Sequence, residues 1–146
     1  MSRVFVSEST GAAIYVFSDD HCPAHVHARH RGEGWIARVK FSYVNDAVKL
    51  MGIAPAKDIP LQRVVNRLLS EFHKRLPDCR RSWWITRRTT CLANQWAIVP
   101  ERGKVELASK GAPHAKQISE AQYAPESESL HVTFRNGTTA EVKLRS

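Results

Sequence analysis

Histidines crowd one short stretch of the chain. Four of the seven lie in Asp20-His21-Cys22-Pro23-Ala24-His25-Val26-His27-Ala28-Arg29-His30, with the spacing H-x3-H-x-H-x2-H. Imidazole titrates near neutral pH and is also the commonest metal ligand. The spacing therefore indicates proton transfer or metal binding, and a plain contact surface is the third interpretation because H-x-H alone is a common pattern.

Strand geometry predicts which of these side chains act together. Residues 24–30 read as a strand, in which successive side chains point to opposite faces. Val26 and Ala28 are the apolar pair and should face the core. We therefore expect one exposed patch, with the loop histidine folded over the strand residues, made of His21, His25, His27 and Arg29.

Each interpretation of this patch uses the side chains differently. The histidines could bind zinc, with Cys22 or Asp20 completing the site. Two histidines and Arg29 could instead act as general base, general acid and phosphate clamp in RNA cleavage through the 2′-hydroxyl. In the third interpretation, the histidines only contact a partner or solvent and take part in no reaction. We take His21, His25, His27 and Arg29 as the candidate catalytic residues. We expect no metal and no cofactor, because the common nucleotide-binding and zinc-protease motifs are absent from the sequence.

A second cluster sets two tryptophans between two arginine pairs, at residues 80–88. Arginines neutralise phosphates and exposed tryptophans stack on bases, a combination typical of single-stranded nucleic-acid binding. Packing of at least one tryptophan into the core is the alternative. The candidate residues for binding nucleic acid or a protein partner are Arg80, Arg81, Trp83, Trp84, Arg87 and Arg88.

The charge of the chain favours a negatively charged partner. Lys and Arg number 22 against 14 Asp and Glu, a formal net charge of +8. The segment from Lys74 to Lys116 contains ten basic and three acidic residues, so it carries a net charge of +7. A local excess of this kind favours nucleic acid or an acidic partner. We expect single-stranded RNA or DNA, or an acidic protein, as the partner, and a homodimer stays an open alternative.

Size and hydropathy limit the class of protein. The 146 residues, 42% of them hydrophobic, are typical of a soluble protein with one domain or two small ones. The longest apolar stretch, residues 12–17, is far shorter than the roughly 20 residues that span a bilayer. The first residues resemble no signal peptide, and the three cysteines lack C-x-x-C spacing. We expect a cytoplasmic protein that does not contact a membrane.

The first part of the chain predicts an antiparallel sheet. Short β-rich runs lie at 12–19, 24–30 and 34–42, and a fourth lies at 48–53. A glycine-containing turn joins the second run to the third. In the third run apolar and polar residues alternate, so that one face carries Trp35, Ala37, Val39 and Phe41.

An amphipathic helix follows at residues 61–76. Asp58 can cap it, Pro60 suits its first turn, and Pro77 should end it. A helix with one apolar face must bury that face, and the preceding sheet is the expected partner. The apolar stripe consists of Leu61, Val64, Val65, Leu68, Leu69, Phe72 and Leu76.

The C-terminal part predicts a β-hairpin. Apolar residues alternate on both sides of Asn136-Gly137, a strong tight-turn signal. Before it, residues 91–99 could form a strand, and glycines and prolines mark turns or a linker. The sequence therefore predicts an α+β protein in which an antiparallel sheet covered by one amphipathic helix precedes a small β module. The expected domains are 1–88, a basic connector at 89–116, and the module at 117–146.

Two resemblances to known families support this division. The stretch Asp20 to His27, followed by a glycine hairpin, a β-run and a helix that reaches Trp83-Trp84, resembles domain-of-unknown-function family 4160. Members of that family carry a D-H-x-P-x-H-x-H motif, and the resemblance covers residues 12–84. It implies that His21, His25 and His27 are the motif positions.

The second resemblance covers residues 118–144, which are similar to domain-of-unknown-function family 2442, small β-rich modules with an L-x-V-x-F-x-[DN]-G core. The two families are often encoded side by side, and the pairing resembles a toxin–antitoxin arrangement. The resemblance implies a protein of toxin–antitoxin type.

Two hypotheses of function follow. In the first, a small basic bacterial protein binds or acts on nucleic acid, as a metal-independent, ribonuclease-like effector. In the second, a non-enzymatic antitoxin or inhibitor docks on an acidic partner protein through its basic patch and β edges. Whether the protein is an enzyme is open at this point.

Overall fold

The computed structural model describes residues 2–102 and 104–144, which form two sheets of antiparallel strands and two α-helices. The expected α+β class is therefore confirmed. The chain divides into two compact units, which are described separately below. The first consists of Met1–Ser42 and Ala47–Arg88, and the second consists of Tyr43–Asp46 and Thr89–Ser146.

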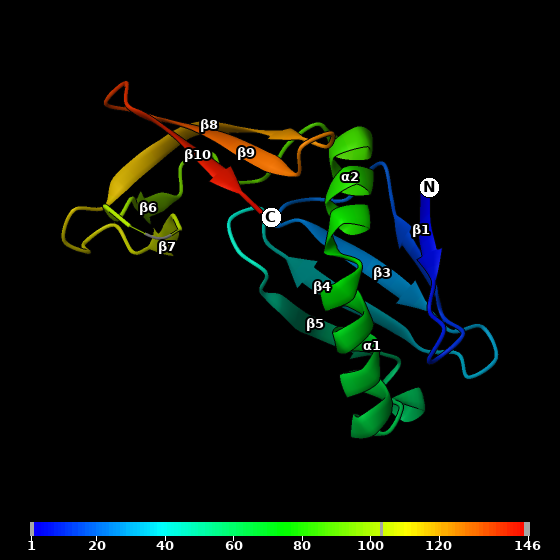
Figure 1. Cartoon of the computed structure of the whole chain (residues 1–146). Helices are drawn as coiled ribbons and strands as arrows, with labels where there is room; N and C mark the ends of the chain where they lie inside the picture. Colours follow the sequence, from blue (N-terminus) through cyan, green and yellow to red (C-terminus); the bar gives the residue numbers. More distant parts are fainter. Residues whose placement is uncertain (1, 103, 145–146) are drawn as a thin grey trace. The chain divides into compact units, whose positions relative to one another are not determined.

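The first sheet is a meander in which each strand pairs with the next in sequence, in the order β1-β2-β3-β4-β5 (Figure 1). Three of the strands lie within expected β-runs and β5 extends one residue past its run, whereas β1 was not predicted. Their bounds are β1 Ser2–Val6, β2 Ala13–Val16, β3 His25–Arg29, β4 Ile36–Phe41 and β5 Val48–Ala54.

The helical region differs from the single helix that was expected. A 3-10 turn at Ala56–Asp58 precedes α1 (Gln62–Lys74), and α2 (Leu76–Arg87) follows after one residue. Pro77 was expected to end the helix, and this expectation is wrong because Pro77 lies in the first turn of α2. Proline is tolerated there because the first N–H groups of a helix have no intrahelical partner.

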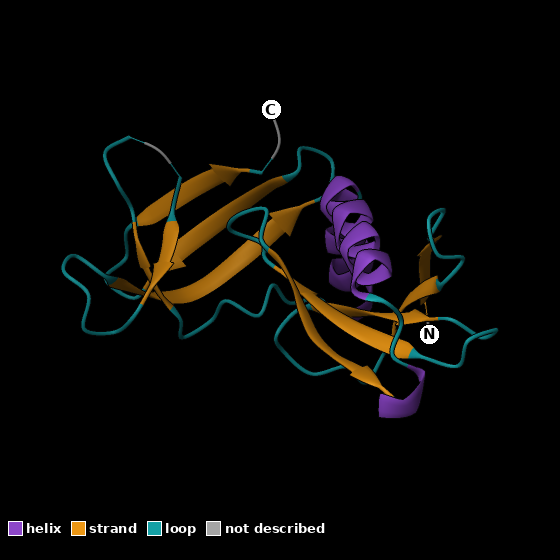
Figure 2. Ribbon diagram, turned by 90° about the horizontal axis from the view of Figure 1, so that it is seen from below, coloured by secondary structure: helices purple, strands orange, loops and turns teal. Residues whose placement is uncertain are grey.

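Both helices pack on one face of the first sheet (Figure 2). α1 contacts β5, and α2 contacts β1, β2 and β3. Phe72 of α1 meets Phe5 of β1 edge to face, with ring centroids 5.6 Å apart. The buried side chains on this face include the expected Val26, Ala28, Ala37, Val39 and Phe41, together with Phe5, Ile14 and Val16, which were not predicted. Among the described residues, neither helix is long and apolar enough to cross a membrane.

The second sheet has the strand order β10-β9-β8-β6-β7. It contains the expected hairpin, in which Gly137 occupies the turn with φ +88°, a conformation that favours glycine. Residues 89–116 were expected as a connector, but they contribute two strands to this sheet. The bounds are β6 Trp96–Ile98, β7 Glu106–Ala108, β8 Lys116–Ala124, β9 Ser129–Phe134 and β10 Thr139–Lys143.

Glu71 of α1 ties the turn after β1 to the helix. Its Oε1 accepts from the Ser7 hydroxyl at 2.6 Å and from the Ser9 backbone N–H at 3.0 Å, and its Oε2 accepts from the Glu8 N–H at 3.0 Å. The Ser9 hydroxyl donates to the same carboxylate. Burial alone would raise the pKa of Glu71, but these hydrogen bonds together outweigh it and hold the pKa below its ordinary value of 4.5.

Replacing Glu71 with Gln should therefore remove an acid-sensitive part of the stability. A group whose pKa is lower in the folded chain stabilises it above the unfolded pKa, and this contribution is lost as the pH falls through the folded pKa. We expect E71Q to lower the free energy of unfolding by on the order of 1 kcal/mol at pH 7. Urea denaturation at several pH values should show that the difference in the free energy of unfolding between E71Q and the unchanged protein disappears towards pH 3. Glu8→Gln, which keeps the backbone N–H and changes a side chain that makes none of these bonds, should show no such difference in the free energy of unfolding. A difference that stays constant with pH would contradict the role of the Glu71 carboxylate.

Candidate functional site

Three side chains converge where β3 begins. Asp20 lies in the loop before the strand, and His25 and His27 project from it. The Oδ1 atom of Asp20 is 3.0 Å from Nε2 of His27 and 3.6 Å from Nε2 of His25. One ligand atom from each of the three residues lies within 4.8 Å of the others. We call these three residues the His–Asp cluster.

The atoms of the cluster that face away from its centre are held in place. His25 Nδ1 is 2.8 Å from the carbonyl oxygen of Pro23, and it must donate because a carbonyl only accepts. The other carboxylate oxygen of Asp20 accepts the Phe17 N–H at 2.8 Å. The Phe17 ring contacts the His27 ring edge to face, with centroids 4.7 Å apart. Three reactive atoms are thus positioned towards one point.

The structure corrects the expected open patch. His25 is buried, with 6% of its surface exposed, and its ring lies 5.4 Å from the ring of Trp83 in α2. Its predicted exposure is therefore wrong, because β3 begins beneath a loop and a helix residue that the strand pattern does not reveal. His27 is half-buried, while His21 and Arg29 are exposed and lie outside the cluster. Sequence reasoning had named Asp20 only as one of two residues that could complete a zinc site.

This arrangement permits two kinds of chemistry. The Asp20 carboxylate accepts the Nε2 proton of His27, a pair that can orient an imidazole for proton transfer. Alternatively, two imidazole nitrogens and one carboxylate oxygen can bind a metal ion, since they are the donor set that zinc accepts in proteins. The side chains of His25, His27 and Asp20 are 8%, 17% and 10% exposed, so the cluster is largely shielded from solvent but still accessible to it.

The arginine and tryptophan cluster of α2 is only partly exposed. Arg80 and Trp83 are fully buried, and Arg80 Nε donates to the carbonyl oxygen of Ser42 at 2.9 Å. Their predicted role in direct binding is therefore wrong, because the helix turns these two positions towards the sheet. Trp84 is half-buried, as is Arg87, which donates to the carbonyl oxygen of Ser18. Arg81 and Arg88 are exposed.

A larger basic surface, which was not predicted from the sequence, lies on the first sheet itself. Directly opposed residues on neighbouring strands share a face, and the register forms three cross-strand rows. One row holds Arg3, Tyr15, His27 and Arg38; the second includes Arg29 and Ile36; the third holds His25, Lys40 and Lys49. Apart from His25, whose ring is buried against Trp83 of α2, the residues of these rows lie on the face opposite the helices, which we call the open face.

The open face carries positive charge without compensation from its own strands. None of the five strands contains an acidic residue. The exposed cations of the open face come from four different strands: Arg3, Arg29, Arg38, Lys40 and Lys49. A signal was available in the sequence, because the alternation in β4 already places Arg38 and Lys40 away from the core.

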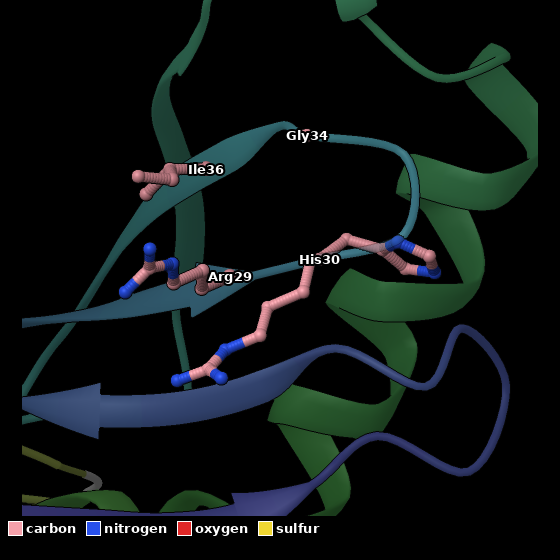
Figure 3. A pocket seen from close by; sticks show the side chains of 5 residues that line it. Arg29, His30, Gly34 and Ile36 are labelled. Carbon is pink, nitrogen blue, oxygen red and sulfur yellow. The ribbon is translucent and has the colours of Figure 1, made fainter.

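A shallow hollow continues this surface at the β3–β4 hairpin. Arg29 and Ile36 extend on one side of the two strands, whereas His30 lies on the other side (Figure 3) and stacks against Trp35, with ring centroids 5.3 Å apart. A neighbouring hollow of ≈ 440 Å³ is lined in part by Arg3, Tyr15 and Arg29. Arg3 and Arg29 therefore line a common hollow with Tyr15 at this end of the open face.

Comparison of the chain with family models, with curated proteins and with solved structures finds no match in any of the three. The resemblances to families 4160 and 2442 accordingly stay predictions.

Proposed function

We propose that the protein binds single-stranded nucleic acid, RNA or DNA, on the open face of the first sheet. The observation that carries the proposal is the cross-strand row of Arg3, Tyr15, His27 and Arg38, flanked by rows that add three more cations. This proposal keeps the nucleic-acid partner inferred from the sequence but moves its main binding surface from α2 to the sheet.

The chemistry of the open face suits a flexible phosphate chain. Five strands at about 4.8 Å spacing make a surface nearly 20 Å wide, on which cations from several strands can each neutralise a phosphate. Tyr15 and His27 place aromatic side chains between those cations in the row, and base stacking on an aromatic side chain tolerates any sequence. A protein partner would need a dense acidic surface to match these cations.

Other parts of the inferred function remain predictions. Exposed Arg81 and Arg88 lie on α2, which covers the other face of the sheet, and would make a separate contact. Four further proposals stand beside nucleic-acid binding: catalysis by His21, His25, His27 and Arg29, a toxin–antitoxin setting, docking as an inhibitor on an acidic protein, and a cytoplasmic location.

Fluorescence anisotropy with a labelled single-stranded RNA of about 12 nucleotides tests the proposal. The logarithm of the association constant should fall with the logarithm of salt concentration, with a slope of up to about −3.5, because five cations contribute about −0.7 each. Replacing Arg38 and Lys40 together with Glu should weaken binding by at least about 100-fold and reduce the slope by about 1.4.

The matched control is the double variant Arg63→Glu with Arg67→Glu, which changes the net charge equally at two exposed positions of α1. It should lose little affinity. An equal loss in both double variants would mean that net charge alone attracts RNA. A loss confined to Arg81→Glu with Arg88→Glu would place the binding surface on α2. Either result, or no RNA retention at low salt, overturns the proposal.

A further inference from the structure

We propose that the His–Asp cluster is a binding site for one divalent transition-metal ion, for which zinc is the best match. The inference reverses the expectation of no metal. The site shares His27 with the proposed nucleic-acid surface, but the inference does not rest on that proposal. It rests on the positions of three atoms: Oδ1 of Asp20 and Nε2 of His25 and of His27.

The spacing of these atoms fits a tetrahedral ion. With bonds of about 2.1 Å, two ligand atoms at adjacent corners of a tetrahedron are about 3.4 Å apart. The separations from Asp20 Oδ1 to the two Nε2 atoms, 3.0 and 3.6 Å, lie on either side of that value. Small side-chain rotations would bring all three atoms within bonding distance of one ion.

The tautomer of His25 supplies the strongest argument. Because its Nδ1 donates to the Pro23 carbonyl, a neutral His25 has a lone pair on Nε2. Nε2 lies 3.6 Å from the Asp20 Oδ1 atom, and the approach of these two electron-rich atoms is unfavourable unless a positive charge, a proton or a metal ion, lies between them. A metal ion satisfies both groups. A backbone carbonyl on the second ring nitrogen is also the usual support of a metal-bound histidine.

The surroundings of the cluster fit the same role. The Phe17 N–H fixes the second carboxylate oxygen of Asp20 and leaves Oδ1 available. The rings of Phe17 and Trp83 flank the two histidines with apolar surface, which limits competition by water. Three protein ligands leave a fourth position for water, as in catalytic rather than structural zinc sites.

Positive neighbours oppose the binding of a cation. Arg38 lies opposite His27 and Lys40 lies opposite His25 in the strand register. Both are exposed, so their charged ends can extend into water, where solvent screens them. Direct bonds to one carboxylate and two nitrogens act at much shorter range, and zinc should therefore still bind, in a position beside two groups that attract anions.

Cobalt(II) absorption tests this site because tetrahedral Co²⁺ absorbs visible light far more strongly than the hydrated ion. Protein free of any histidine tag should be stripped with a chelator and titrated with Co²⁺ in the absence of RNA. We expect an intense band that saturates at one ion per chain and disappears on addition of Zn²⁺. Asp20→Asn and His27→Gln should each lower the affinity for Co²⁺ by at least about 10-fold.

His21→Ala is the matched control, because it removes an exposed imidazole beside the cluster and should leave the titration unchanged. A wild-type spectrum identical to that of hydrated Co²⁺ would overturn the proposal whatever the variants do. So would retention of the band in both cluster variants. RNA affinity measured in chelator reports on the open face separately, so the two proposals can fail independently.

Discussion

Replacing Trp83 with Ala is expected to lower the free energy of unfolding by about 3–5 kcal/mol, the range for deleting a buried aromatic side chain. Trp83 is completely buried, and its ring contacts His25 at the start of β3. The change would leave a cavity between α2 and the sheet. Urea denaturation followed by circular dichroism measures the loss. Trp83→Phe, which keeps most of the apolar contact, should cost less.

The control on the same helix is Ile85→Ala, because Ile85 is 57% exposed and should contribute within about 0.5 kcal/mol. The result separates two interpretations of the aromatic pair. A stacking platform for bases would lose RNA affinity without losing stability. If Trp83→Ala behaves in that way, the buried position of the ring is incorrect.

Arg80→Ala is expected to have the second large effect on stability, a loss of at least about 2 kcal/mol. The Arg80 side chain is fully buried, and its Nε donates to the Ser42 carbonyl at the end of β4. Removing the guanidinium leaves that carbonyl without this donor and opens space beneath α2. Thermal and urea denaturation should both report the change.

Its neighbour provides the control. Arg81 is exposed, so Arg81→Ala should change the free energy of unfolding by no more than about 0.5 kcal/mol. Equal effects of the two changes would contradict the packing of α2 on the sheet. Two adjacent arginines of the same helix are thus expected to differ by at least about 1.5 kcal/mol.

The arginine pair also shows why the α2 cluster was misinterpreted. Residues adjacent in sequence are separated by about 100° around a helix, so a run of basic residues cannot share one face. The expected helix ended at Pro77, which left residues 80–88 without an assigned geometry. Once α2 is known, Arg80 and Trp83, three positions apart, belong on the same buried side.

Strands were predictable where alternation was unbroken. β4 keeps a strict period of two, and its buried and exposed residues match the prediction at every position. β8 was missed because its register shifts between Ile118 and Glu120, so that the buried residues are Ile118, Ala121 and Tyr123. A bulge of this kind changes the phase of the pattern and hides the strand.

The candidate site was predictable only in its local part. The histidines of β3 stand out because they are close in sequence, and Asp20 is near enough to have been considered. The open face has only a partial signal, since the alternation in β4 places Arg38 and Lys40 away from the core, whereas Arg3 and Lys49 come from other strands. Only the strand register, set by hydrogen bonding and by burial of the opposite face, brings them together.

The most direct test of the central claim is to map where a short single-stranded RNA perturbs the backbone amide resonances of the protein in solution. Titration at low salt should shift the resonances of open-face residues first. The largest changes are expected at Tyr15, His27, Arg29, Arg38 and Lys40, whereas the buried positions that alternate with them, such as Val26 and Val39, should move less.

Reversal at high salt should accompany these shifts, because counterions compete for the same cations. The map would contradict the account if the shifts were confined to α2 around Arg81 and Arg88, or to strands of the second sheet. An absence of shifts at low salt, where electrostatic binding is strongest, would contradict it equally.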